Sequence, residues 1–194
     1  IAEAMSIAQQ GVAEKKPMFF GERSGIEQRL GWAESKTAVL AGLDAEAGKP
    51  AQAKLAAART QIDKMADSLA RQIIDNNKPP SDNYAGSDRE AIIARALDGW
   101  KHQQPDAKLL GAAIPSEAWE RELKWEWFSG AFYKVDRSRI QVQLIIKHDN
   151  ELAVIRPMNM IKNHLKGDTV IAVPLYDIKD KVQPWGYVRL DRLK

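Results

Sequence analysis

The sequence contains no cysteine. This absence excludes disulfide bonds, zinc sites built on thiolates and cysteine nucleophiles. Long apolar runs are also missing, because none approaches the roughly 18 residues that a membrane-spanning helix needs. We therefore expect no membrane span, and a fold that is held together by packing rather than by cross-links.

Local signatures of catalysis and cofactor binding are absent as well. The sequence has no G-x-S-x-G serine elbow, no G-x-x-x-x-G-K-[ST] loop and no G-x-G-x-x-G loop. The three histidines, His102, His148 and His164, never occur at H-x-x-x-H spacing. We expect neither a metal nor a cofactor, although folding could bring His148, Asp149 and His164 together in a composite site.

Charge is distributed unevenly along the 194 residues. Residues 1–107 carry 14 basic and 15 acidic side chains, a net charge of −1, whereas residues 108–194 carry 15 and 11, a net charge of +4. An anionic partner would therefore meet the second half. Because dedicated nucleic-acid binders show a denser basic stripe, nucleic acid is not the partner that we expect.

The sequence begins at Ile1 without an initiator methionine. A removed signal peptide and a trimmed chain are both consistent with this start. A removed signal peptide, together with the lack of cysteine, leads us to expect an extracytoplasmic protein, periplasmic or secreted.

Residues 1–78 have the apolar spacing of helices. One stripe runs through Ile26, Leu30, Ala33, Thr37 and Leu40, and a second through Leu55, Ala58, Ile62, Met65 and Leu69. Two glycines and a proline in residues 42–50 interrupt the pattern. We predict an antiparallel helical hairpin over 1–78 with its loop at 42–50.

Residues 79–87 are rich in proline, asparagine and serine, and this composition is typical of a linker. A helix is predicted directly afterwards, because Ser87 and Glu90 have capping-box spacing and the apolar positions up to Trp100 share one face. The second domain is predicted to span 88–194.

From Lys108 onward the apolar period changes from 3.6 to 2 residues, which indicates strands. Residues 119–127 and 139–147 alternate, residues 148–151 form a tight-turn sequence, and 168–176 and 186–190 supply further strands. The predicted class is α+β, with a helix packed on an antiparallel meander. By its element order alone this architecture is cystatin-like.

Two C-terminal stretches suggest an alternative fold for the C-terminal part of the chain. "KGDTVIAV" (166–173) and "WGYVRLDRLK" (185–194) resemble the turn-strand and the final strand of bacterial Src-homology-3-type domains. The resemblance implies a small barrel at the C-terminus, of the kind that binds cell-wall components or peptides outside the cytoplasm.

The stretch "AWERELKWEWF" (118–128) places Trp119, Trp125 and Trp127 on one strand face. Aromatic residues on strands usually pack inward, which favours a core position under the 88–102 helix. Arg121 interrupts this face and leaves a second interpretation open, an aromatic surface that holds a ligand. The candidate ligand-binding residues are Trp119, Arg121, Trp125, Trp127, Arg139 and Lys147.

These observations predict a non-catalytic binding module that contacts a protein or a glycan. One alternative is a hydrolase with acids among Glu120, Glu122, Asp149 and Asp168. The other is a protein that binds an anionic polymer, nucleic acid or glycan, through a basic face that includes Arg139 and Lys147.

Overall fold

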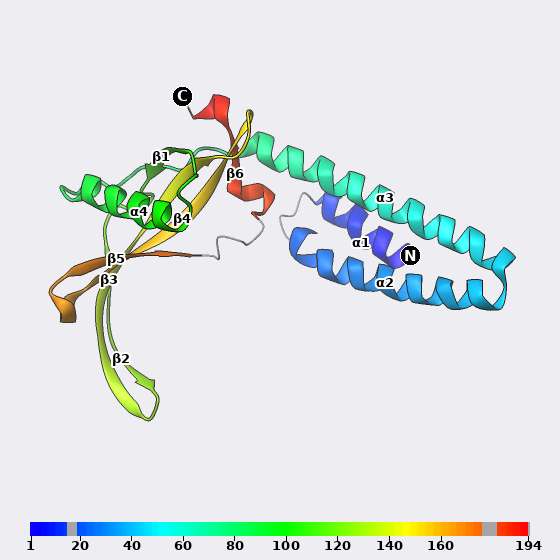
Figure 1. Ribbon diagram of the computed structural model, residues 1–194, viewed down its shortest axis with the longest axis horizontal. Coiled ribbons are helices and arrows are strands. Elements are labelled where there is room, and N and C mark those ends of the chain that lie inside the picture. The colour runs from blue at the N-terminus through cyan, green and yellow to red at the C-terminus, as the bar shows by residue number, and fades with distance from the viewer. Residues whose placement is uncertain (15–18, 176–181, 194) are drawn as a thin grey trace. The chain divides into compact units, whose positions relative to one another are not determined.

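A computed structural model describes residues 1–14, 19–175 and 182–193, which form two compact units, Ile1–Asn76 and Asn77–Lys194. Predictions that fall on 15–18, on Tyr176 at the end of the predicted strand 168–176, and on Lys194 lie outside the described residues. Figure 1 shows a helical unit and a sheet unit, which are described separately below.

The helical unit contains α1 (Ala2–Ala13), α2 (Phe19–Leu43) and α3 (Ala45–Asn76). Helices α2 and α3 run side by side in opposite directions, and α1 packs against both (Figure 1). The two predicted apolar stripes are buried at most of their positions, while α1 is a third helix that the predicted hairpin did not include. Its small residues complete a core made of Ala4, Ala8, Ile26, Leu30, Leu55, Ile62, Ala66 and Leu69.

The predicted loop at 42–50 is wrong, because Asp44 alone separates α2 from α3 and Pro50 lies within α3. The Asp44 carboxylate accepts hydrogen bonds from the backbone N–H groups of Glu46 (3.0 Å) and Ala47 (3.1 Å), and so caps α3. A side chain at Gly48 would place its Cβ 2.5 Å from the Ala41 Cα. The glycine therefore serves the close approach of the two helices, not a loop.

The sheet unit contains one long helix and six antiparallel strands, which confirms the α+β class and the turn at 148–151. The helix, α4 (Arg89–Gln103), covers one face of the sheet (Figure 1). The strands are β1 (Leu109–Ala113), β2 (Glu120–Phe128), β3 (Ala131–Lys147), β4 (Leu152–Asn163), β5 (Thr169–Pro174) and β6 (Tyr187–Arg189). Short 3-10 helices occupy His164–Lys166, Pro184–Gly186 and Leu190–Arg192.

The long β3–β4 hairpin is the centre of the sheet. Strands β1 and β2 lie end to end along the outer edge of β3, and β5 and β6 lie end to end along the outer edge of β4. The sheet is therefore open, and the alternative of a small C-terminal barrel is wrong. The two stretches behind that alternative pair with different ends of β4 instead of with each other.

The core of the sheet unit lies between α4 and the inner face of the sheet. Gly99 brings the helix close to β5, since a Cβ there would lie 3.0 Å from the Ala172 Cβ. Most of the core's buried side chains come from α4, β3 and β4: Ile92, Ala96, Trp100, Ile140, Val142, Leu144, Ile146, Val154, Met158 and Met160.

Residues 79–87, expected to form a linker, make specific contacts with the sheet unit. Asp82 accepts a hydrogen bond from the Ile114 N–H (3.1 Å), and Tyr84 is buried in the core. Asp88, not Ser87, is the N-cap of α4, and it makes no side-chain cap bond. The predicted capping box is not formed, because the Asp88 carboxylate accepts from the Tyr84 hydroxyl at 2.5 Å instead.

We expect Leu144→Ala to lower the free energy of unfolding by about 2–5 kcal/mol, because Leu144 of β3 is fully buried in the core of the sheet unit and its truncation leaves a cavity. Urea unfolding followed by near-ultraviolet circular dichroism measures the change. Leu43→Ala is the control, since Leu43 is 83% exposed. Equal costs for the two substitutions would contradict the core described here.

Candidate binding surface

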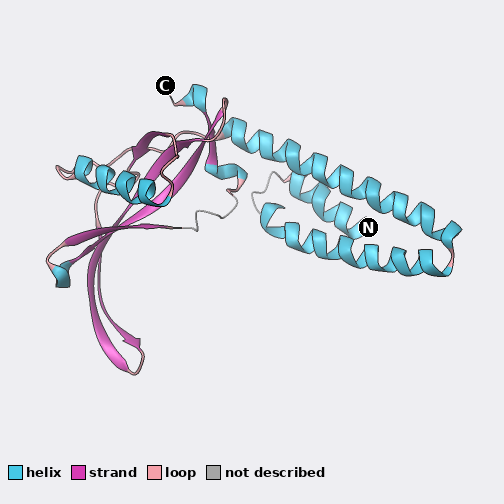
Figure 2. Cartoon of the chain, viewed as in Figure 1, coloured by secondary structure: helices cyan, strands magenta, loops and turns pink. Residues whose placement is uncertain are grey.

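Strand β3 extends beyond the strand that supports it. Strand β4 pairs with β3 only from Arg137 to Lys147, whereas β2 pairs with β3 from Ala131 to Arg139. Among the described strands, β2 is therefore the only neighbour of residues 131–136 of β3. The result is a ribbon, residues 120–139, whose outer part, 123–136, has two strands and projects from the sheet (Figure 2). In the described part of the sheet unit, no helix and no other strand covers either face of this outer part.

A two-residue turn closes the ribbon. Ser129 and Gly130 have φ values of 51° and 87°. Positive φ at both central residues is the pattern of a type I′ turn, whose twist matches that of the flanking strands. This turn fixes the register in which Trp127 lies opposite Phe132 and Phe128 lies opposite Ala131.

Large apolar side chains occupy both faces of the ribbon beside this turn. Trp125, Trp127 and Phe132 share one face, while Phe128 and Tyr133 share the other, because directly opposed residues point the same way. We call these five residues with Leu123 the tip. Their exposed fractions are 60% (Leu123), 67% (Trp125), 64% (Trp127), 73% (Phe128), 66% (Phe132) and 52% (Tyr133).

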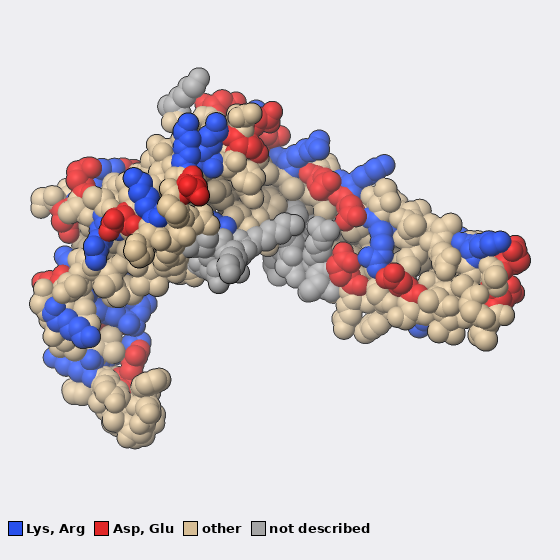
Figure 3. Space-filling view, viewed as in Figure 1, with Lys and Arg blue, Asp and Glu red and all other residues tan. Residues whose placement is uncertain are grey.

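Figure 3 shows that the far end of the ribbon is uncharged, with acidic and basic side chains nearer the sheet. The rings support one another in edge-on pairs: Trp127 and Phe132 have centroids 4.9 Å apart, and Phe128 and Tyr133 have centroids 6.5 Å apart. Such pairing restrains each ring while leaving it accessible.

The interpretation of the tryptophans as core is therefore wrong for Trp125 and Trp127. Both side chains are more than 60% exposed because no described helix or third strand of the sheet unit lies beneath this part of the ribbon. Trp119 does pack against the core of the sheet unit, as that interpretation expected. The aromatic run thus begins in the core and ends in solvent.

Ion pairs connect the two strands behind the tip. Glu122 is at their centre, since its carboxylate contacts Arg137 (2.6 Å), Lys124 (2.5 Å) and Arg139 (3.1 Å). The hydrogen bond from Arg137, with that from Lys124, lowers the pKa of Glu122 from 4.5 to about 2. Lys124 also contacts Glu126 at 2.5 Å. The charged part of the ribbon is therefore largely self-neutralised.

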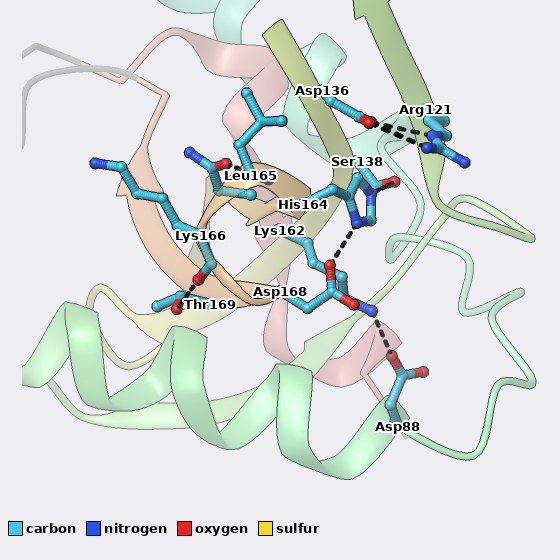
Figure 4. Close-up of polar contacts among 11 residues, drawn as sticks. Asp88, Arg121, Asp136, Ser138, Lys162, His164, Leu165, Lys166, Asp168 and Thr169 are labelled. Carbon is cyan, nitrogen blue, oxygen red and sulfur yellow. Dashed lines mark hydrogen bonds and ion pairs between the residues drawn. The ribbon is translucent and has the colours of Figure 1, made fainter.

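We call the part of the ribbon near Arg121 and Asp136, where it leaves the sheet, the root. Polar contacts join the root to the rest of the sheet unit (Figure 4). Arg121 donates two hydrogen bonds, both 3.2 Å long, to Asp136, and this contact lowers the pKa of Asp136. Beside it the Trp119 indole donates to Asp88 (3.2 Å), and the Lys162 ammonium lies 4.5 Å from the centre of that indole. These contacts hold both strands of the ribbon where it leaves the sheet.

Ser138, His164 and Asp168 form a second row of contacts at the root. His164 Nε2 lies 2.8 Å from the Ser138 hydroxyl, and Nδ1 lies 2.5 Å from the Asp168 carboxylate (Figure 4). When Nδ1 donates a hydrogen bond to the carboxylate, Nε2 accepts one from the Ser138 hydroxyl, which is the arrangement of a serine–histidine–aspartate triad. Ser138 is only 6% exposed, however. Burial of the hydroxyl favours a role in fixing the short 3-10 helix to β3.

Lys147 lies far from the tip, at the other end of β3. It lines a cleft of about 640 Å³ together with His148 and Asp149. Asp149 also accepts from the backbone N–H groups of Glu151 (2.7 Å) and Leu152 (2.8 Å), which lowers its pKa. His148 and His164 flank opposite ends of β4, so the composite histidine site is not formed.

The candidate residues thus fall into separate places. Trp125 and Trp127 belong to the tip, Trp119 and Arg121 to the root, Arg139 to the ion pairs of the ribbon and Lys147 to the distant cleft. Sequence reasoning missed the turn at Ser129 and Gly130, and it did not include Phe128, Phe132 and Tyr133 among the candidate site residues. A serine–glycine pair between two aromatic runs was the signal that could have found them. Within the described residues, no group of three or more His, Asp or Glu side chains could hold a metal ion.

We expect the Glu122 carboxyl to titrate near pH 2 in the folded protein. Because its folded pKa lies below the ordinary glutamate value of 4.5, its contribution to stability is complete above that value and is lost as the pH falls through about 2. Carbon-13 shifts of the side-chain carboxyl measure this titration. Arg137→Gln removes the strongest partner and should move the pKa upward, while a wild-type titration near 4.5 would contradict the ion-pair geometry.

We expect Ser138 to resist a fluorophosphonate probe, since a buried hydroxyl is closed to the reagent. Ser138→Ala should instead lower the free energy of unfolding by about 0.5–1.5 kcal/mol, the usual contribution of one hydrogen bond. Intact-protein mass spectrometry and urea unfolding give the two readouts. Labelling of the wild type that Ser138→Ala abolishes would show a reactive nucleophile.

Comparisons with protein-family models, with curated proteins and with solved structures give no match. Among the described helices, none is both long and apolar enough to cross a membrane. The assignment of function therefore depends on the geometry of the ribbon and its tip.

Proposed function

We propose that this chain is a non-catalytic binding module whose contact surface is the tip of the β2–β3 ribbon. The observation that carries the proposal is the exposure of six large apolar side chains, each more than half open to solvent, at one end of the sheet unit. Contiguous exposed apolar surface of this kind is typical of interaction sites. Burying one such side chain contributes about 1.5–3 kcal/mol of favourable free energy, so covering the tip contributes substantially to the free energy of binding.

The root supports this proposal because it presents the tip in a defined direction. Nine residue pairs link β2 to β3, and the Arg121–Asp136 contact lies where the ribbon leaves the sheet. A surface that is ordered before binding loses less conformational entropy on association. The ribbon is thus suited to bind a partner through its side chains, although the backbone groups along its outer edges are exposed to water.

The charged candidates fit the two alternative functions less well. Glu122 is fully engaged in ion pairs, and Asp149 and Asp168 have structural partners. Arg139 and Lys147 share a strand face but are eight residues apart, about 26 Å along a strand. A polymer bound through both would have to span the sheet, whereas the tip offers one continuous surface.

An extracytoplasmic location is part of this proposal. A sequence without cysteine folds independently of the redox state of its compartment, which agrees with export but does not require it. Fractionation of the cells that make the protein tests this part, and recovery in the cytosol alone would contradict it.

An environment-sensitive fluorophore on Ala131→Cys tests the binding function, because the natural sequence has no other cysteine to label. We expect the emission to shift to the blue with one of three fractions of the source cells: membranes, wall polysaccharide or soluble protein. Trp127→Ser with Phe132→Ser should abolish the shift. No response to any fraction would overturn the proposal.

The matched control is Trp32→Ser with Leu43→Ser, which removes two apolar side chains that are 59% and 83% exposed in the helical unit. This variant should respond like the parent. A shift that survives the tip substitutions and disappears in the control would place the contact outside the ribbon.

A further inference from the structure

We infer that the partner of the tip is a lipid bilayer, and that the tip inserts into the interfacial layer between headgroups and acyl chains. This inference rests on the proposed binding function and names the kind of surface that is bound. The proposed membrane contact is peripheral and is made by the end of a β-ribbon.

The apolar character of both faces is the first argument. Trp127 and Phe132 point to one side of the ribbon, while Phe128 and Tyr133 point to the other. A flat protein surface or a sugar ring covers one face and leaves the opposite aromatic residues in water. A bilayer surrounds an inserted tip on every side, so all four rings leave water together.

The length of the uncharged segment is the second argument. No charged residue occurs between Glu126 and Lys134. With a rise of about 3.4 Å per residue, Trp127 lies about 7–10 Å from the end of the turn. Amphipathic surface elements bury their apolar faces about 5–10 Å deep in the headgroup boundary. The charged residues would therefore begin where the interface meets water.

The kinds of side chain also fit this depth. Tryptophan and tyrosine combine an apolar ring with a polar group, and they are enriched where membranes meet water. The backbone sets a limit, because the outer edges of a two-stranded ribbon leave N–H and C=O groups unpaired, and these groups are costly in hydrocarbon. Both constraints place the tip in the interfacial layer and not across the bilayer.

The charges behind the tip predict little preference for anionic lipid. The ribbon carries five basic and four acidic side chains, a net charge of +1. Lys124 contacts both Glu122 and Glu126. Insertion of aromatic rings, which salt does not screen, is then the main source of affinity.

Phosphatidylcholine vesicles test the inference with the full chain. We expect the protein to float with the vesicles, with blue-shifted tryptophan emission that is quenched by lipids brominated near the headgroup. Trp127→Ser with Phe132→Ser should weaken binding by at least about tenfold, given the value of burying such side chains. Mixing in phosphatidylglycerol should strengthen binding by no more than about fivefold, the effect of about one exposed lysine.

Trp32→Ser with Leu43→Ser is again the control and should bind like the parent. Equal loss in this control would overturn the inference, because the helical unit would then supply the contact. No flotation in either lipid would also overturn it. If the fluorophore at Ala131→Cys still responded to wall polysaccharide or soluble protein, only the lipid would be excluded and the binding function would remain. A requirement for anionic lipid would replace insertion by electrostatic attachment.

Discussion

The mismatch in length between β3 and β4 determines the character of the sheet unit. β3 has 17 residues, but β4 pairs with it only from Arg137 onward. A strand buries its face when a layer packs over it, and in the described part of the sheet unit no layer covers the end of β3 that only β2 accompanies. Residues 131–134 are therefore exposed, although two of them are aromatic. The tip, its exposure and the proposed role of the ribbon all depend on this mismatch.

The tryptophan run shows why sequence reasoning was accurate for the strand and inaccurate for its burial. Alternation over 119–127 correctly predicted extended backbone, because pleating sends successive side chains to opposite faces. It could not show what lies above those faces. Trp119 meets the core because α4 and Lys162 are close to it, whereas Trp127, eight residues farther along the ribbon, contacts the exposed ring of Phe132 and stays 64% exposed. Burial depends on tertiary contacts, and the periodicity of a sequence pattern does not reveal those contacts.

Similar limits apply to the helical parts of the chain. The apolar stripes located α2 and α3, but the glycines and the proline of 42–50 wrongly predicted a loop. Asp44 supplies the cap, and Gly48 permits close packing, so residues that often break helices serve a tight helical hairpin. Ser87 and Glu90 likewise had the spacing of a cap, but Asp88 and Tyr84 formed a competing contact. The apolar patterns found these elements, and side-chain contacts that the patterns did not reveal decided where they begin and end.

The distribution of charge along the ribbon argues that the exposed tip is a contact surface and not a packing defect. A projecting strand pair with open edges is prone to self-association, and charged residues on such strands oppose it. Behind the tip the ribbon follows this rule, because Lys124, Glu122 and Arg137 make it polar. These charged residues end at Glu126 on one strand and at Lys134 on the other, and four aromatic side chains lie beyond them. Within the ribbon, aromatic exposure is thus concentrated toward the end that projects from the sheet, where a partner can reach both faces.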